Sequence, residues 1–208
     1  MPIYQQFYTS KSSIYIWKIE ESLEFFLAKT YLNEVSKKRL ENMNAISHKR
    51  GFLAVRMLLQ HINLTDNDLI YSESGKPFLS SGKHISISHA HTFSVIMISD
   101  EICGTDIEIK KEKIIKIGPR FCDESHLNDY QEDQALKISK YTIAWGIKEA
   151  IFKIKNEAGI SFPKHISIDP FNLNEKQVTA NLLFNKKKEV FQASFKEIEG
   201  FILVWIES

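Results

Sequence analysis

The sequence predicts an α+β protein of two similar lobes, each a small antiparallel sheet packed with helices. Strand patterns come first, helical stripes follow, and strand patterns return at the end, which is the order expected for this class. With 208 residues and 43% hydrophobic content, the chain can bury the core of one large domain or two small lobes. We place an N-terminal lobe at 1–101 and a C-terminal lobe at 102–208, related by a pseudo-twofold arrangement around a cleft.

In the N-terminal half, the first element is a strand pattern at 12–19, followed by a helix at 23–29 that Ser22 caps. The pattern then indicates an exposed helix at 33–43, a core-facing helix at 46–62, and strands at 85–89, 93–99 and 102–109. Because only a short turn joins the last two strands, we expect them to form a hairpin.

In the C-terminal half, the main element is a helix over 139–154, since Ala144, Ile147, Ile151 and Ile154 form one apolar stripe. Strand patterns follow at 166–169, 178–184, 189–195 and 201–206. Polar turns at 185–186 and 199–200 separate the last three strands. We therefore expect a meander after the long helix.

Charge and composition exclude several classes of protein. A net charge of +1 argues against a general nucleic-acid binder, whose surface is normally much more basic. Cys103 and Cys122 match neither a metal-binding spacing nor a disulfide framework, which suits a reducing compartment. The start resembles no signal peptide, and no apolar run is long enough to span a bilayer. We expect a cytoplasmic protein, not bound to membranes, and a monomer because its two lobes would supply both walls of the cleft.

Two acids in the strand at 102–109 point to a divalent cation. Gly104, Asp106 and Glu108 share one face of this strand, while the opposite face is core-like. Neighbouring carboxylates repel each other unless a cation with oxygen ligands lies between them. Gly104 would let a substrate approach the backbone. The alternative is a solvated edge strand with two surface acids.

Glu149 and Lys153 lie one turn apart in the long helix. An exposed pair with this spacing is ordinary and contributes about 0.3–0.5 kcal/mol. The neighbouring Trp145 and Phe152 make a fully exposed pair less attractive. Glu149 is therefore a third candidate acid for the cation.

Several polar side chains of the N-terminal half could hold an anion. Arg50 and Arg56 lie on the core-facing helix and could each present a guanidinium to a phosphate, although surface ion pairing explains them equally well. Lys76 lies in a Gly-Lys-Pro turn, and Ser88 and His89 end a strand. A histidine at a strand end is more often structural than catalytic, so its role stays open.

Four motifs in order resemble the 4′-phosphopantetheinyl transferases of the two-lobed, surfactin-synthetase-activating type. They are the Gly-Lys-Pro segment at 75–77, the strand that ends in Ser88-His89, the G-x-D-x-E segment at 104–108, and the W-x-x-K-E-A-x-x-K helix at 145–153. The resemblance covers about 50–162. One such motif is weak support, whereas four in order and at similar separations are strong support.

The resemblance implies a Mg²⁺-dependent enzyme that moves the phosphopantetheine arm of coenzyme A to a serine of an apo acyl or peptidyl carrier protein, releasing adenosine 3′,5′-bisphosphate. By this resemblance, the metal ligands are Asp106, Glu108 and Glu149, and Glu149 or a bound water is the base. Lys153 resembles the lysine near the leaving pyrophosphate. The groups that resemble coenzyme A phosphate contacts are Arg50, Arg56, Lys76, Ser88, His89 and Lys148.

The sequence departs from the family pattern at Thr105, where an aliphatic residue is usual, and at Gly146, where Ser or Thr is common. Two alternatives stay open: an inactive relative that still binds coenzyme A, and another magnesium-dependent enzyme that cleaves pyrophosphates. The basic run at 110–116 and Arg120 are candidate contacts for an acidic helix of the carrier protein.

Overall fold

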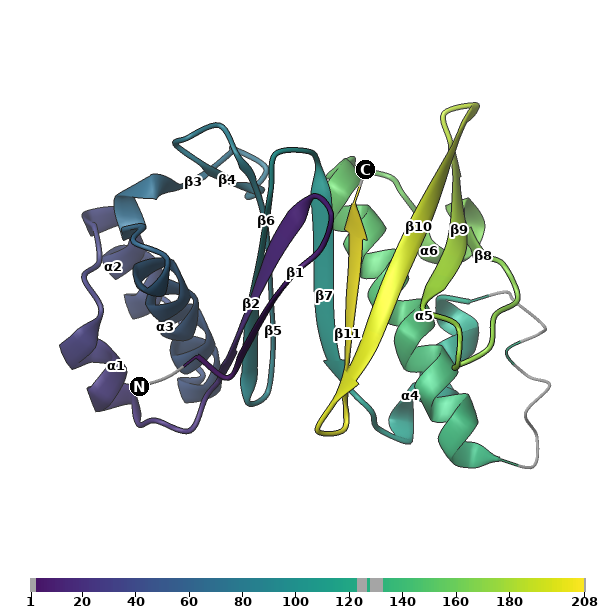
Figure 1. The fold of residues 1–208 in the computed structure, drawn as a ribbon, viewed down its shortest axis with the longest axis horizontal. Helices are drawn as coiled ribbons and strands as arrows, with labels where there is room; N and C mark the ends of the chain where they lie inside the picture. The colour runs from purple at the N-terminus through teal and green to yellow at the C-terminus, as the bar shows by residue number, and fades with distance from the viewer. Residues whose placement is uncertain (1–2, 123–126, 128–132, 208) are drawn as a thin grey trace. The chain divides into compact units, whose positions relative to one another are not determined.

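The structure, a computed structural model, describes residues 3–122, 127 and 133–207. The chain divides into two compact units, Met1–Cys103 (unit 1) and Gly104–Ser208 (unit 2). Each unit combines a sheet with helices, which confirms the α+β class (Figure 1). Within the described ranges, none of the helices is both long and apolar enough to cross a membrane.

Unit 1 contains a six-stranded antiparallel sheet and a layer of helices that covers one face of it (Figure 1). In spatial order the strands are β1 (Gln5–Tyr8), β2 (Ser12–Lys18), β6 (Phe93–Ser99), β5 (His84–Ala90), β4 (Pro77–Leu79) and β3 (Leu69–Tyr71). The helices are α1 (Leu23–Lys29), α2 (Glu34–Glu41) and α3 (Ile46–His61), with a 3₁₀ turn η1 (Asp66–Asp68).

Side-chain caps fix where the first two helices begin. Ser22 Oγ accepts a hydrogen bond from Phe25 N at 3.2 Å, so the predicted start of α1 is confirmed. Asn33 Oδ1 accepts from Ser36 N at 2.8 Å and starts α2 in the same way. In each case the side chain satisfies a backbone N–H that has no partner inside its helix.

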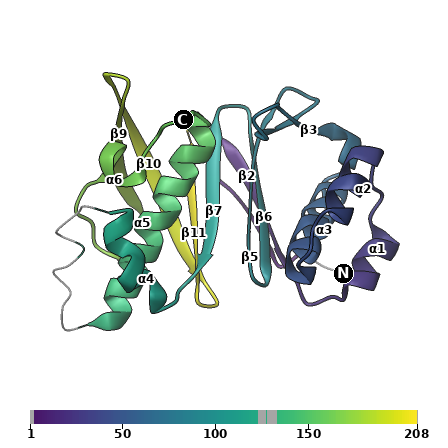
Figure 2. The same cartoon turned by 180° about the vertical axis from the view of Figure 1, so that it is seen from behind.

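Unit 2 contains a five-stranded sheet with the long helix α5 along one face (Figure 2). In spatial order the strands are β7 (Cys103–Ile109), β11 (Phe201–Glu207), β10 (Lys187–Ile198), β9 (Gln177–Phe184) and β8 (Ile166–Ile168). The helices are α4 (Lys113–Ile117), α5 (Gln134–Lys155) and α6 (Phe162–His165), with a 3₁₀ turn η2 (Gly118–Arg120). The predicted stripe of α5 is confirmed, because Ala144, Ile147, Ile151 and Ile154 are all buried.

The two units repeat one topology. Apart from β1, the strand order in unit 1 is β2-β6-β5-β4-β3, and the order in unit 2 is β7-β11-β10-β9-β8. In each unit the first strand pairs with the last, and a long helix, α3 or α5, connects the first strand to the rest. The expectation of two similar lobes is confirmed, although no repeat is visible in the sequence.

The predicted hairpin between 93–99 and 102–109 is wrong. β6 pairs with β2 on one side and β5 on the other, so neither edge is open to a further strand. β7 instead lies beside β11 in the sheet of unit 2. The turns at 185–186 and 199–200 are confirmed, and all four of their residues have positive φ, which suits two-residue hairpin turns.

A buried polar network joins α2, α3 and η1. Arg56 Nε donates to Asp66 Oδ1 at 2.9 Å, and both side chains are only 3% exposed. Arg56 also donates to Ser36 Oγ at 3.1 Å and to the carbonyl oxygen of Phe52 at 3.3 Å. Asp66 Oδ2 accepts from Asn33 N at 2.9 Å. Each charge therefore has an opposite charge and further hydrogen bonds, as a buried ion pair requires.

We expect Arg56→Ala to lower the free energy of unfolding by about 3–5 kcal/mol, because Asp66 would remain buried without its counter-charge. Urea denaturation measures the change. The matched control is Lys83→Ala, which breaks the exposed 3.0 Å Lys83–Asp100 pair and should cost less than about 1 kcal/mol. Equal losses in the two variants would contradict the structural role of Arg56.

Candidate active site

The acidic face of β7 packs against α5. A Cβ atom added at Gly104 would lie 2.4 Å from the carbonyl oxygen of Ala150, so only glycine allows this approach of strand and helix. On the same face Asp106 is only 4% exposed, and Glu108 is half-buried. Two expectations are therefore corrected. The face of Gly104, Asp106 and Glu108 is covered by a helix, and Gly104 admits that helix where we expected a substrate.

The side chains of α5 that meet these acids are spaced one turn apart. Trp145, Glu149 and Lys153 follow the i, i+4 spacing of an α-helix and so lie in one row. Trp145 Nε1 donates to Glu108 Oε1 at 3.2 Å, and Lys153 Nζ donates to Asp106 Oδ1 at 2.7 Å. Packing thus brings together Asp106, Glu108, Glu149 and Lys153 from two segments more than thirty residues apart in sequence.

The two departures from the family pattern both have packing reasons. A Cβ atom added at Gly146 would lie 2.8 Å from Val204 Cγ2 and 3.7 Å from Asp106 Oδ2, so glycine lets α5 lie close to β11. Thr105 is fully buried, and its Oγ1 donates to the carbonyl oxygen of Val204 at 2.8 Å. A hydroxyl is therefore satisfied where the family usually has an aliphatic side chain.

Lys153 is paired with the strand. Its ammonium binds Asp106 Oδ1 and also donates to the carbonyl oxygen of Thr105 at 3.0 Å. The side chain of Asp106 is 5% exposed and that of Lys153 is 28% exposed. The alternative of an ordinary exposed pair between Glu149 and Lys153 therefore does not describe this lysine.

The carboxylates of Asp106, Glu108 and Glu149 repel one another, and burial leaves them poorly solvated. Burial is the largest cause that raises the pKa of the Glu108 carboxyl to about 7, and the charge of Asp106 adds to it. The hydrogen bond from Trp145 acts in the opposite direction. Burial and then the charge of Asp106 also raise the pKa of Glu149, while Lys153 lowers it. Both glutamates therefore bind a proton more readily than they would in water.

The chemistry of the three acids suits a hard cation, since all the donors are carboxylate oxygens whose mutual repulsion a cation would relieve. Among the described residues, however, no three His, Cys, Asp or Glu side chains form a group that could hold a metal ion by themselves. Mg²⁺ does not require one, because it usually keeps several waters and binds one or two carboxylates together with substrate phosphates. The acids therefore fit a magnesium site that substrate completes.

Two predicted phosphate contacts lie in buried structural positions. Lys148 is fully buried, and its Nζ donates to the carbonyl oxygens of Phe162 and Ile166, which ties α5 to α6 and β8. Arg56 belongs to the network with Asp66. Because both cations already bind protein oxygens away from solvent, their placement argues against the predicted contacts with a phosphate.

Only some of the remaining predicted phosphate contacts of unit 1 lie near one another. His89 is exposed on β5 and lies against Gly51 of α3, where an added Cβ atom would be 2.9 Å from His89 Cδ2. Arg50 precedes Gly51 on α3, and its Nη2 donates to the carbonyl oxygen of Ile19 at 3.1 Å. Ser88 is buried and points to the opposite face of β5 from His89.

His48 is a further candidate that sequence reasoning missed. Its ring centroid lies 6.1 Å from that of His89, in an edge-on arrangement, and its side chain is exposed in the first turn of α3. The only signal in the sequence was its position beside basic residues at the start of a helix. Lys76 is half-buried in the turn that joins β3 to β4, where its N–H donates to Ser72 Oγ at 3.1 Å.

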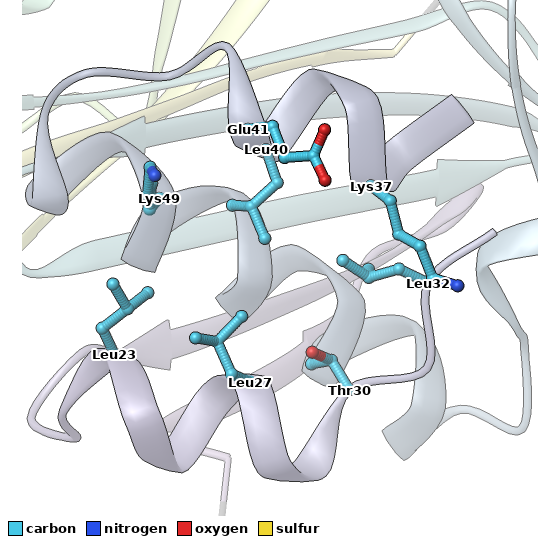
Figure 3. A pocket seen from close by; sticks show the side chains of 8 residues that line it. All are labelled: Leu23, Leu27, Thr30, Leu32, Lys37, Leu40, Glu41 and Lys49. Atoms are coloured by element: carbon cyan, nitrogen blue, oxygen red, sulfur yellow. The ribbon is translucent and has the colours of Figure 1, made fainter. Parts of the chain in front are cut away.

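Unit 1 also contains an apolar groove of about 410 Å³ among its helices (Figure 3). Its lining residues are Leu23, Leu27, Thr30, Leu32, Lys37, Leu40, Glu41 and Lys49. None of the predicted site residues lines this groove. The groove therefore adds nothing to the chemistry of the acids.

Comparison with known proteins shows what this chain is similar to. Residues 102–204 match the family model of the 4′-phosphopantetheinyl transferase superfamily. A relative from Aneurinibacillus migulanus, named 4′-phosphopantetheinyl transferase gsp, is 31% identical over 146 residues, which cover 67% of this chain and 58% of the relative. The chain thus spans less than two thirds of that relative's length. The range of the family match contains Asp106, Glu108, Glu149 and Lys153, whereas Arg50 and His89 precede it.

We expect the stability of the protein without metal to fall as pH rises from about 4.5 to 7. The pKa of Glu108 is about 7 in the folded protein against an ordinary value of 4.5, so the folded state binds more protons in this window. Glu108→Gln removes this contribution. Urea denaturation at pH 5 and pH 8 should therefore show a smaller loss in the variant than in the wild type.

The control for this pH dependence is Glu175→Gln, which changes an exposed glutamate of the same unit. It should follow the wild type at both pH values. A Glu108→Gln variant that loses as much stability as the wild type would contradict the raised pKa of Glu108.

Proposed function

The chain belongs, through residues 102–204, to the 4′-phosphopantetheinyl transferase superfamily, and on this premise we propose that it transfers the phosphopantetheine arm of coenzyme A to a serine of an apo carrier protein. The adenosine part of coenzyme A leaves as adenosine 3′,5′-bisphosphate. The observation that carries the proposal is the packing of β7 against α5, which gathers three carboxylates and a lysine within the matched range.

In this reaction a carrier serine oxygen forms a bond to the phosphorus that bears the pantetheine, and the bridging P–O bond of the pyrophosphate breaks. Such transfers need charge neutralisation and positioning more than covalent participation by the protein. Asp106, Glu108 and Glu149 would hold Mg²⁺, which when bound neutralises charge on the pyrophosphate. Lys153 adds positive charge for the departing phosphate.

Glu149 is the residue we assign to the proton of the carrier serine, which it accepts directly or through a water. Without a bound cation, burial and the charge of Asp106 raise the pKa of Glu149, so its carboxylate accepts a proton more readily than that of an ordinary glutamate. Glu149 is also half-buried and lies in the row of α5 that faces the acids of β7. We therefore expect both metal binding and proton transfer to depend on it.

For unit 1 we propose that Arg50, Lys76 and His89 hold phosphate groups of coenzyme A, with His89 at the 3′-phosphate. His89 is exposed and has His48 as its neighbour, and Arg50 is half-buried on α3. Guanidinium and imidazolium groups are suited to phosphate because they donate charged hydrogen bonds. Arg56 and Lys148 are left out of this set because they are buried among protein oxygens.

Intact-mass spectrometry tests the proposal. With Mg²⁺ and coenzyme A, the protein should add the mass of one phosphopantetheine arm to at least one member of a panel of apo acyl and peptidyl carrier proteins. Asp106→Ala should slow transfer by at least about 10²-fold, because it removes charge stabilisation at the site. The control Asp169→Ala changes an exposed acid of unit 2 and should not slow it. The proposal fails if the whole panel stays unmodified and Asp106→Ala leaves coenzyme A binding unchanged.

One calorimetric competition separates the two alternatives. An inactive relative would bind coenzyme A in preference to other pyrophosphates, yet transfer nothing to any carrier protein. A different pyrophosphate-cleaving enzyme would bind NAD, another pyrophosphate, as well as coenzyme A. Preferential binding of coenzyme A together with transfer is the result expected of the transferase.

We further propose that the basic segment 110–116 and Arg120 contact an acidic helix of the carrier protein. Lys113 and Lys116 are exposed on α4, whereas Ile114 anchors this helix in the core of unit 2. Lys110 is paired with Glu197 at 2.5 Å. A partner could therefore reach the exposed side chains of the segment, which include Lys111 and Arg120 besides the lysines of α4.

We expect Lys113→Glu to raise the carrier Michaelis constant several-fold with little change in kcat, because charge reversal on an interface rim mainly slows association. Steady-state kinetics at varied carrier concentration measures this. Lys188→Glu, an exposed charge reversal on β10, is the control and should leave the constant as in the wild type. A carrier Michaelis constant unaffected by Lys113→Glu would count against this docking surface.

A further inference from the structure

Trp145 links the two elements that carry the acids. Its indole Nε1 lies 3.2 Å from Glu108 Oε1, so the helix α5 donates a hydrogen bond to a carboxylate of β7. Trp145 precedes Glu149 by four residues and therefore belongs to the same row of the helix. One side chain of α5 thus orients an acid of the strand beside the acid that α5 itself contributes.

The indole ring has little freedom to turn away. It contacts Phe121 at 4.9 Å and Phe162 at 5.6 Å between ring centroids, both in edge-on arrangements. Phe121 is almost fully buried and Trp145 is half-buried. Because aromatic neighbours hold the ring, the N–H direction is set by packing before any ligand arrives.

A neutral donor suits this position better than a cation. Asp106 already has an ammonium, that of Lys153, on one of its oxygens. An indole N–H donates one hydrogen bond and carries no net charge, so it orients Glu108 and leaves the negative charge for a metal ion. The two carboxylates of β7 are therefore held by different means, one by charge and one by a neutral donor.

Resting on the function proposed above, we propose that Trp145 is a positioning residue that holds Glu108 in the orientation in which it binds Mg²⁺. Partners of metal ligands commonly act in this way, and their removal typically weakens metal binding 10- to 100-fold. Trp145 does not itself touch the metal or the reacting atoms.

The test is a calorimetric titration of Mg²⁺ into the full chain with coenzyme A present. Trp145→Phe keeps an aromatic ring between Phe121 and Phe162 but removes the N–H. We expect it to weaken Mg²⁺ binding about 10- to 100-fold. Coenzyme A binding without Mg²⁺ should stay within twofold of the wild type, which separates loss of positioning from general damage.

Trp17 provides a matched control, because its Nε1 donates to Glu21 Oε2 at the same distance of 3.2 Å in unit 1. Trp17→Phe should bind Mg²⁺ like the wild type. Tryptophan fluorescence adds a spectroscopic readout: Mg²⁺ should change the emission of the wild type and of Trp17→Phe, and should not change that of Trp145→Phe. This difference would place the Mg²⁺ site beside Trp145, and the affinities from the titration decide whether Trp145 positions Glu108.

Each outcome decides the proposal. If the Trp145→Phe variant binds Mg²⁺ with an affinity within twofold of that of the wild type, the positioning role is overturned and the proposed function still stands. A wild type that binds no Mg²⁺ in the presence of coenzyme A overturns both. If Trp145→Phe fails to fold, benzothienylalanine at position 145 keeps the two-ring shape, replaces the N–H by sulfur, and is judged by the same criterion.

Discussion

The close approach of α5 to β7 is the contact on which the candidate site depends. Gly104 has no side chain that would clash with the Ala150 carbonyl oxygen, and Gly146 has none that would clash with Val204 of β11. With strand and helix this close, acids from one element meet the tryptophan, acid and lysine of the other. Two glycines therefore determine the site without contributing any chemistry to it.

This packing has an electrostatic cost that the proposed function would explain. Burial and mutual repulsion raise the pKa of both Glu108 and Glu149, so the site without a cation is a place of unfavourable charge. Lys153 offsets part of the repulsion by pairing with Asp106. A stable fold alone would gain from apolar residues at these positions, whereas a binding site for a cation and a pyrophosphate needs the acids. In the proposed function, the bound cation would offset the repulsion that the fold alone leaves between these acids.

Much of this arrangement could be predicted from the sequence because it follows from period and spacing. The period of two in a strand put Asp106 and Glu108 on one face, and the i, i+4 spacing put Glu149 and Lys153 on one row of a helix. The cap Ser22 predicted the start of α1 for the same reason, since the chemistry of a cap is local. The features that depend on residues close together in the sequence were therefore predicted correctly.

The parts that the sequence did not predict depend on contacts between distant segments. The prediction that β6 and β7 form a hairpin was wrong, because β2 and β5 pair with the two edges of β6. Surface or phosphate contacts could not be excluded for Arg56 and Lys148 from the sequence. The sequence does not show that Asp66 lies beside Arg56, or that the carbonyl oxygens of Phe162 and Ile166 lie beside Lys148. The bond from Trp145 to Glu108 joins residues 37 positions apart, so only the position of Trp145, one turn before Glu149, hinted at it.

The most direct measurement counts the protons released when Mg²⁺ binds in the presence of coenzyme A, by calorimetry at pH 7 in two buffers of different ionisation enthalpy. Because the pKa of Glu108 is about 7 without metal, a cation that binds its carboxylate must displace on the order of half a proton at this pH. We expect the wild type to release that much more than Glu108→Gln, which also corrects for protons from coenzyme A. Equal release from the two proteins would contradict the claim that these acids hold the cation.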